Sequence, residues 1–274
     1  MIDEGAPSFF KLEVRRKSEL SHTNTVLCMK WGTAFAAQDI NLLYRSCKAY
    51  TKSTLRFICL TDDVRDLDVG IETRDIPDIG LTPAEIALRG VWRKLSLYAQ
   101  ELHDLGRVLF IDLDMMVVGP LDDFFAVSRG MTFQNMGDSW RRNSKSDHRE
   151  GGTCIFSFDP AEEYGILQAF LENKSSHIGN YRNEQDFAFG HASSTAFWPN
   201  DYVISFKRHL CRRYGAGLFK GLRAVPEGAL VIAFHGDPRP RDVAENPVWG
   251  PFPHLHCGTP ALVRDYWLRF GAPV

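Results

Sequence analysis

The stretch GRVLFIDLDMMVVGPLDDFF, residues 106–125, is the most informative part of the sequence. Its apolar run is interrupted by Asp112 and Asp114, which a single leucine separates. Residues i and i+2 of an extended chain point to the same side, so both carboxylates are predicted to lie together at a strand end. Carboxylates beside a buried strand are costly unless something compensates them. A divalent cation such as Mg²⁺ or Mn²⁺ is one explanation, and two solvated turn residues are the other.

Length and composition limit the classes of protein to which the chain can belong. Its 274 residues suit one large α/β domain or two closely packed halves, and 44% hydrophobic residues supply a core. A formal net charge of −2 gives no overall field for nucleic acid, so we expect no such partner. We expect neither a transmembrane segment nor a signal peptide, because no apolar run has the required length. Six cysteines without a CxxC pair favour reduced thiols and a cytoplasmic location.

The order of the predicted elements indicates a parallel sheet. TVLCMKW (25–31) and LRFICLTDD (55–63) are typical of buried strands, and the segment between them places Ile40, Leu43 and Cys47 on one helical face. A strand–helix–strand order predicts a βαβ unit, whose ligands bind at the carboxyl ends of the strands. The other predicted elements are helices at 91–105, 159–174 and about 260–270, strands at 107–114, 131–134, 153–158 and 229–236, and a long polar loop at 135–152.

Four blocks of the sequence carry a resemblance to a known family. WRKLSLYAQELHDLGRVLFIDLDMMVVGPLDDFF (92–125) resembles the helix–strand–DxD–strand segment of GT-A type nucleotide-sugar glycosyltransferases. The nearest resemblance is to glycosyltransferase family 8 and its uncharacterised bacterial relatives. GGTCIFSFDP (151–160), NEQDF (183–187) and VIAFHGDPRPRD (231–242) resemble three further blocks of that family, in the family's order.

The resemblance implies an α/β GT-A fold, in which a Rossmann-like, mixed and mostly parallel sheet is flanked by helices in a single domain. Residues 1–23 would form a polar lead-in, and residues 24–274 would form the domain. Its nucleotide-binding half would span about 24–125, and its acceptor half about 126–274.

Three residues depart from the family pattern. Arg239 and Arg241 stand where family members usually have lysine and tryptophan, and Lys94 stands where arginine is frequent. Lysine and arginine keep the charge at two of these positions but differ in hydrogen-bonding geometry. The departures therefore bear on which sugar donor is used more than on the class of reaction.

The resemblance also implies the residues of the site. Asp112, Asp114 and His235 would hold Mn²⁺ or Mg²⁺. The implied contacts to the donor nucleotide are Thr33, Phe35, Asp62, Asp63, Lys94, Asp112, Leu113, Asp114, Gly236 and Arg239. Catalytic roles would fall to Gln185, Asp186 and Lys94, with Glu184 as a neighbour able to replace one of the first two. For most of these residues, a turn, a helix cap or a solvated surface charge is the alternative explanation.

The function expected on this basis is metal-dependent transfer of a sugar from a nucleotide-diphosphate sugar, UDP-linked, to an unknown acceptor, with retention of configuration. A DxD-type phosphohydrolase with Asp112 as nucleophile is one alternative, and a non-catalytic carbohydrate- or nucleotide-binding module is the other. The basic run from Lys207 to Arg223 would be a solvated face, or would contact anionic lipid or an anionic acceptor. HLHC (254–257) is too tightly spaced to predict a zinc site.

Overall fold

The computed structural model describes residues 23–137, 140, 148–212, 214, 216–250, 252 and 255–271. The expected lead-in lies outside the described residues except for Thr23, which begins the first strand. Most of the predicted loop at 135–152 also lies outside them.

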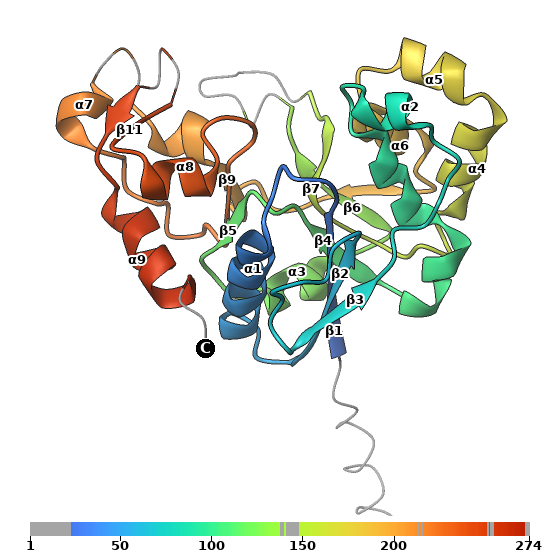
Figure 1. Cartoon of the computed structure of the whole chain (residues 1–274), viewed down its shortest axis with the longest axis horizontal. Helices are drawn as coiled ribbons and strands as arrows, with labels where there is room; N and C mark the ends of the chain where they lie inside the picture. The colour runs from blue at the N-terminus through green and yellow to red at the C-terminus, as the bar shows by residue number, and fades with distance from the viewer. Residues whose placement is uncertain are drawn as a thin grey trace, which may run out of the picture.

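A seven-stranded sheet forms the centre of the molecule (Figure 1). Its strands are β1 (Thr23–Lys30), β2 (Thr54–Thr61), β3 (Ile71–Arg74), β4 (Val108–Ile111), β6 (Met131–Asn135), β7 (Gly151–Phe158) and β8 (Thr195–Phe197). They are arranged in the order β3-β2-β1-β4-β7-β6-β8. Only β7 pairs antiparallel with its neighbours, so the sheet is mixed and mostly parallel, as the sequence predicted.

Helices flank this sheet on several sides. Helix α1 lies in front of it, while α2, α4, α5 and α6 gather at one end and α7, α8 and α9 at the other (Figure 1). The helices are α1 (Ala37–Ala49), α2 (Pro83–Ala87), α3 (Asp122–Val127), α4 (Tyr164–Glu172), α5 (Lys174–Asn180), α6 (Glu184–His191), α7 (Gly217–Lys220), α8 (Pro240–Glu245) and α9 (Ala261–Phe270). Short helices of other types in the described residues include η1 (Trp92–Tyr98), η2 (Gln100–Leu105) and the π-helix η4 (Phe206–Leu210).

A second, smaller sheet contains β5 (Met115–Val117), β10 (Val231–Ala233) and β9 (Val203–Ser205), in the order β5-β10-β9. The chain passes from the large sheet to the small one between β4 and β5, and this passage contains both aspartates. A separate pair is formed by β11 (Val248–Trp249) and β12 (His256–Cys257). The acidic pair therefore lies at the junction of two sheets.

The central strands are buried on both faces. Leu27 and Phe110 belong to one apolar cluster, whereas Val26 and Leu109 belong to another on the opposite side of the sheet. A strand covered on both sides needs apolar side chains at successive positions, which explains the continuous apolar runs in the sequence. Within the described residues, no helix combines the length and apolar character needed to cross a membrane. None of the six cysteines forms a disulfide.

Two predicted helices differ from the structure. Residues 91–105 form two 3-10 helices, because Ala99 has an extended backbone that interrupts the segment. Helix α4 begins at Tyr164 instead of directly after Asp159. The Asp159 carboxylate accepts a hydrogen bond from the Ala161 amide at 3.0 Å, which stabilises a turn of the chain instead of capping the helix.

Candidate active site

Pairing in the small sheet brings distant parts of the sequence to the acidic pair. Ala233 on β10 pairs with Met115 on β5 and with Ser205 on β9. One residue further, the Phe234 amide donates to the Asp114 carbonyl at 3.0 Å. This register places His235, which follows β10, beside the turn that carries the aspartates.

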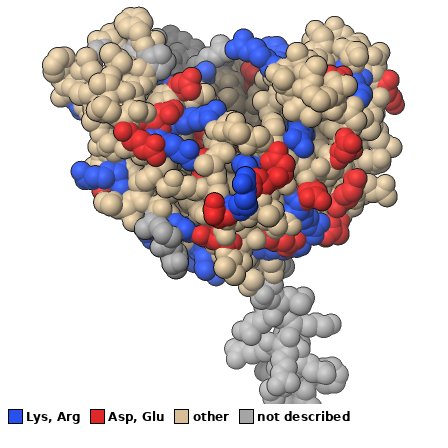
Figure 2. Space-filling view, viewed as in Figure 1, with Lys and Arg blue, Asp and Glu red and all other residues tan. Residues whose placement is uncertain are grey.

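Two adjoining cavities open around Asp112 and Asp114. The first, of about 230 Å³, is lined among others by Lys94, Glu184, Gln185, His235 and Gly236. The second, of about 280 Å³, is lined by residues after β1 and by Leu113. Both aspartates and Val91 border both cavities. The strand β1 points towards the upper edge in Figure 1, and Figure 2 shows the surface hollowed above that edge, with Lys and Arg side chains beside the hollow.

Lys94 compensates one of the two aspartates. Its buried ammonium donates to both carboxylate oxygens of Asp112, at 2.9 and 3.0 Å, and to the carbonyl of Thr153 at 2.6 Å. Burial by itself lowers the pKa of Lys94, but the charges of Asp112 and Glu184 outweigh that effect and raise the pKa. The lysine is therefore a permanent cation on the floor of the cavity. Burial raises the pKa of Asp112, and Lys94 opposes the rise.

Asp114 has no comparable partner among the residues that the structure describes. Residues 112–114 form a turn between β4 and β5, so the side-by-side placement of the two carboxylates does not arise from strand geometry as predicted. Burial, followed by the neighbouring charge of Asp112, raises the pKa of Asp114 to about 7. Asp112 and Asp114 therefore share a site with one fixed cation, the Lys94 ammonium, whose two carboxylate hydrogen bonds both go to Asp112.

His235 is half-buried beside this turn. Its Nε2 lies 2.6 Å from the Ser205 hydroxyl, and its ring contacts Trp140 at 5.8 Å between centroids. Burial and the positive charge of Lys207 lower the pKa of His235 to about 4. The imidazole is neutral at neutral pH, which is the form that binds a metal.

The NEQDF block contributes Glu184 and Gln185 to the cavity, whereas Asp186 is not among its lining residues. The Gln185 side-chain oxygen accepts from the Thr153 amide at 3.2 Å. Glu184 is buried, accepts from the Thr153 hydroxyl at 2.8 Å and lies 3.8 Å from the Lys94 ammonium. Asp186 forms an ion pair with Arg182. Burial raises the pKa of Glu184 to about 7.

The second cavity carries aromatic and cationic groups. Phe35 lines it, and the Arg239 guanidinium lies 4.6 Å from the centre of the Phe35 ring. Arg239 also donates to the Ala34 carbonyl, which links the loop after β10 to the loop after β1. Lys30 and Trp31 complete this side. An apolar wall with nearby fixed charge suits a planar base attached to an anionic group.

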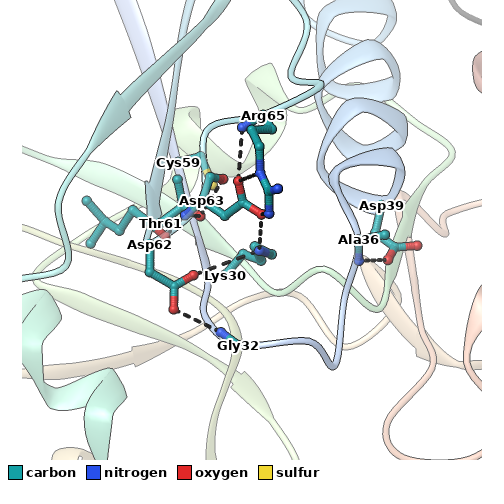
Figure 3. A network of polar contacts seen from close by, with 10 residues as sticks. Lys30, Gly32, Ala36, Asp39, Cys59, Thr61, Asp62, Asp63 and Arg65 are labelled. Atoms are coloured by element: carbon teal, nitrogen blue, oxygen red, sulfur yellow. Dashed lines mark hydrogen bonds and ion pairs between the residues drawn. The ribbon is translucent and has the colours of Figure 1, made fainter.

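Asp62 and Asp63 support this cavity without lining it. Figure 3 shows both carboxylates around the Lys30 ammonium, each at 3.8 Å. Asp62 also accepts from the Gly32 amide at 3.0 Å, and Asp63 forms an ion pair with Arg65 at 2.8 Å. The hydrogen bonds from Arg65 lower the pKa of Asp63 well below its usual range.

Thr33 is exposed and lies beside the second cavity without being one of its lining residues. Gly236 lines the first cavity and has a φ of +70°, a left-handed conformation that favours glycine. The structure therefore gathers most of the predicted residues in the linings of two cavities and leaves Thr33, Asp62, Asp63, Asp186 and Arg239 outside these linings.

The chemical types of the available donor atoms, carboxylate oxygens and an imidazole nitrogen, suit a divalent cation such as Mn²⁺ or Mg²⁺. Asp112, Asp114 and His235 supply carboxylate oxygens and a neutral imidazole, and burial together with the neighbouring Asp112 charge raises the pKa of Asp114. In the parts of the chain that the structure describes, no three His, Cys, Asp or Glu side chains already form a group that could hold an ion. The His235 Nε2 is engaged with Ser205, so binding would require the ligands to draw together.

The sequence did not predict the roles of two residues of the site, Lys30 and Glu184. Lys30 ends an apolar strand and was not singled out, although a lone lysine at a strand's carboxyl end is a detectable signal. For Glu184, the resemblance implies only that it could replace Gln185 or Asp186 in a catalytic role. Asn183 caps α6, since its side-chain oxygen accepts from the Asp186 amide at 2.9 Å. An N-cap at Asn183 means that Glu184, Gln185 and Asp186 lie in the first turn of a helix, where successive side chains point in different directions.

No protein-family model and no curated protein matches the sequence. Solved structures do match. The galactosyltransferase LgtC, solved with donor and acceptor sugar analogues, has a TM-score of 0.58 and 11% identity over 90% of this chain and 95% of LgtC.

The fold is that of the GT-A glycosyltransferases. GlyE of Streptococcus pneumoniae TIGR4 matches with a TM-score of 0.56 and 13% identity over 91% of this chain. WbbM, a bifunctional glycosyltransferase, matches with a TM-score of 0.54 and 13% identity over 80%. The matches span 61% of the GlyE chain and 46% of the WbbM chain, so both of those proteins extend well beyond the region shared with this one. At these identities the likeness concerns the fold.

Proposed function

We propose that the chain is a metal-dependent glycosyltransferase that transfers a sugar from a UDP-sugar to an acceptor hydroxyl. The observation that carries the proposal is the pair of adjoining cavities around Asp112 and Asp114 at the junction of the two sheets. One cavity has the features of a nucleoside site and the other has charged groups suited to the diphosphate and the sugar. Phe35 and Lys30 line the second cavity, which has the features of the nucleoside site, and Arg239 packs against the Phe35 ring.

Metal binding, orientation of a ligand and stabilisation of the leaving group would fall to different residues. Asp112, Asp114 and His235 would hold Mn²⁺ or Mg²⁺, which supplies Lewis-acid stabilisation of the departing nucleoside diphosphate. Lys94 fixes the orientation of Asp112 through two hydrogen bonds. Arg239 contributes positive charge near the developing negative charge of the leaving group. During transfer the bond between the anomeric carbon and the diphosphate breaks, and the acceptor oxygen forms the new bond and loses its proton.

Gln185 would contact the transferred sugar, and its position in the lining of the cavity that also contains Lys94 and Asp114 supports this role. A structure of LgtC carries a glutamine-to-glutamate substitution in its active site, which supports a role for a glutamine in a site of this fold. The motif resemblance to glycosyltransferase family 8 supports retention of configuration. The unpaired cysteines support a cytoplasmic location.

The test is incubation with Mn²⁺ and a panel of nucleotide sugars, with release of nucleoside diphosphate as the readout. We expect turnover with a UDP-sugar, and loss of turnover in Asp114→Asn, which keeps the shape of the side chain but removes its charge. Release of phosphate from a phosphomonoester would instead favour the phosphohydrolase. Binding without turnover would favour a non-catalytic module. Activity of Asp114→Asn equal to that of the unmodified protein would contradict the metal site.

A further inference from the structure

Lys207 stands out among the charged residues near the site because its ammonium has no hydrogen-bond or ion-pair partner in the described part of the chain. It is half-buried on η4, directly after β9. Removing part of a charge's hydration without giving it a partner is unfavourable, so such a group is a candidate for binding a ligand.

The fold aims this lysine at the loop after β10. Strands β9 and β10 are parallel and pair Ser205 with Ala233, so Lys207 and His235 occupy equivalent steps beyond their strands. The Ser205 hydroxyl holds the two segments together through His235 at 2.6 Å, and it accepts from the Arg208 amide at 3.1 Å. The position of η4 relative to the cavity is therefore fixed by hydrogen bonds.

The Lys207 ammonium lies next to Gly236. A Cβ added to Gly236 would lie 3.6 Å from the Lys207 Nζ, within van der Waals contact, and the φ of +70° at this position favours glycine. Gly236 itself lines the cavity that contains Asp114 and His235. Burial lowers the pKa of Lys207, and Arg208 adds to the effect although Asp237 opposes it.

We propose that Lys207 binds a phosphate group of the donor diphosphate across Gly236, as a second cation opposite Arg239. This inference rests on the proposed function, and it assigns a ligand to the first residue of the basic run at 207–223. The Arg239 guanidinium already donates to the Ala34 carbonyl and packs on the Phe35 ring, so only some of its N–H groups remain for a phosphate. Lys207 has all three ammonium hydrogens available.

The test measures binding of inorganic pyrophosphate, UDP and uridine in Mn²⁺ by calorimetry. Lys207→Met should weaken pyrophosphate and UDP by about 10- to 100-fold, the range for a lost hydrogen bond to a charged group, and should leave uridine unchanged. Lys207→Arg should retain most of the affinity. Lys220→Met, which removes an exposed lysine on α7, is the matched control and should bind all three ligands normally.

The outcomes separate this inference from the proposed function. Undiminished pyrophosphate and UDP binding in Lys207→Met would overturn the role of Lys207 and leave the transferase proposal intact. Equal loss of all three ligands would show a general structural defect and would also overturn it. If the unmodified protein binds pyrophosphate but no nucleoside diphosphate, the UDP-sugar proposal fails. The pyrophosphate affinity of Lys207→Met, compared with that of the unmodified protein, then still tests whether Lys207 binds the anion. If it binds neither, both fail.

Discussion

Lys94→Met is the substitution that most directly tests the electrostatics of the site. Methionine preserves much of the length and volume of the side chain but removes the cation from Asp112 and Glu184. Breaking a buried ion pair by removing one partner costs about 3–5 kcal/mol. The Asp112 side chain is 35% exposed, so water can take over part of the lost solvation. We therefore expect the lower end of that range, about 3 kcal/mol, in the free energy of unfolding.

Urea unfolding followed by circular dichroism would measure this change, with Lys220→Met as the exposed control. The double variant Lys94→Met/Asp112→Asn removes the stranded charge together with its partner. It should be less destabilised than the sum of the single variants by about 0.5–3 kcal/mol, the range for residues in direct contact. A Lys94→Met protein within about 0.5 kcal/mol of the unmodified one would refute the reasoning, because that is the range for surface positions.

Two further predictions concern neighbouring parts of the site. Burial raises the pKa of Glu184 from 4.5 to about 7, so between these values the folded chain holds a proton that the unfolded chain has lost, and stability should rise as pH falls from 7 to 5. Glu184→Gln should flatten that part of the profile in urea unfolding, and identical slopes in the two proteins would count against it. Phe35→Ala should weaken UDP by about 1–3 kcal/mol through loss of an aromatic wall, and pyrophosphate much less. Calorimetry with both ligands checks this, and equal losses would place Phe35 outside the nucleoside site.

The core of the fold was predictable because burial on both faces leaves a direct trace in the sequence. The runs around Leu27 and Leu109 are apolar at successive positions, and no pairing information is needed to recognise them as central strands. Helix α1 was equally clear, since Ile40, Leu43 and Cys47 are all buried on one face.

The helix expected at 91–105 was wrong for a physical reason. Apolar residues at spacings of three and four fit two short 3-10 helices joined by one extended residue as well as they fit one α-helix. Val91, at the start of the segment, has a left-handed backbone with φ of +58°, which periodicity does not reveal for a β-branched residue.

The geometry of the site depends on contacts that local sequence does not encode. The proximity of Asp114 and His235 follows from the pairing of β5 with β10, strands separated by more than one hundred residues. Motif resemblance suggested that these residues meet, but it did not show that Asp186 turns towards Arg182 while Glu184 turns towards Lys94. The partners of Glu184 come from elsewhere in the chain, since Thr153 on β7 and Lys94 on η1 hold Glu184.

The distribution of charge explains why the proposed ligand should be a metal–diphosphate pair and not either ion alone. Among the described residues that line the first cavity, the carboxylates of Asp112, Asp114 and Glu184 face a single lysine, so the floor is short of positive charge. On the rim, Lys207 and Arg239 lie beside Gly236 and Ala34. An isolated phosphate would approach the rim but be repelled by Asp114, and an isolated cation would approach the floor but be repelled by the rim. A ligand that carries both charges, with the cation towards the floor and the phosphates towards the rim, satisfies the two surfaces at once. Each ion should therefore raise the affinity for the other by the same factor, as linkage requires.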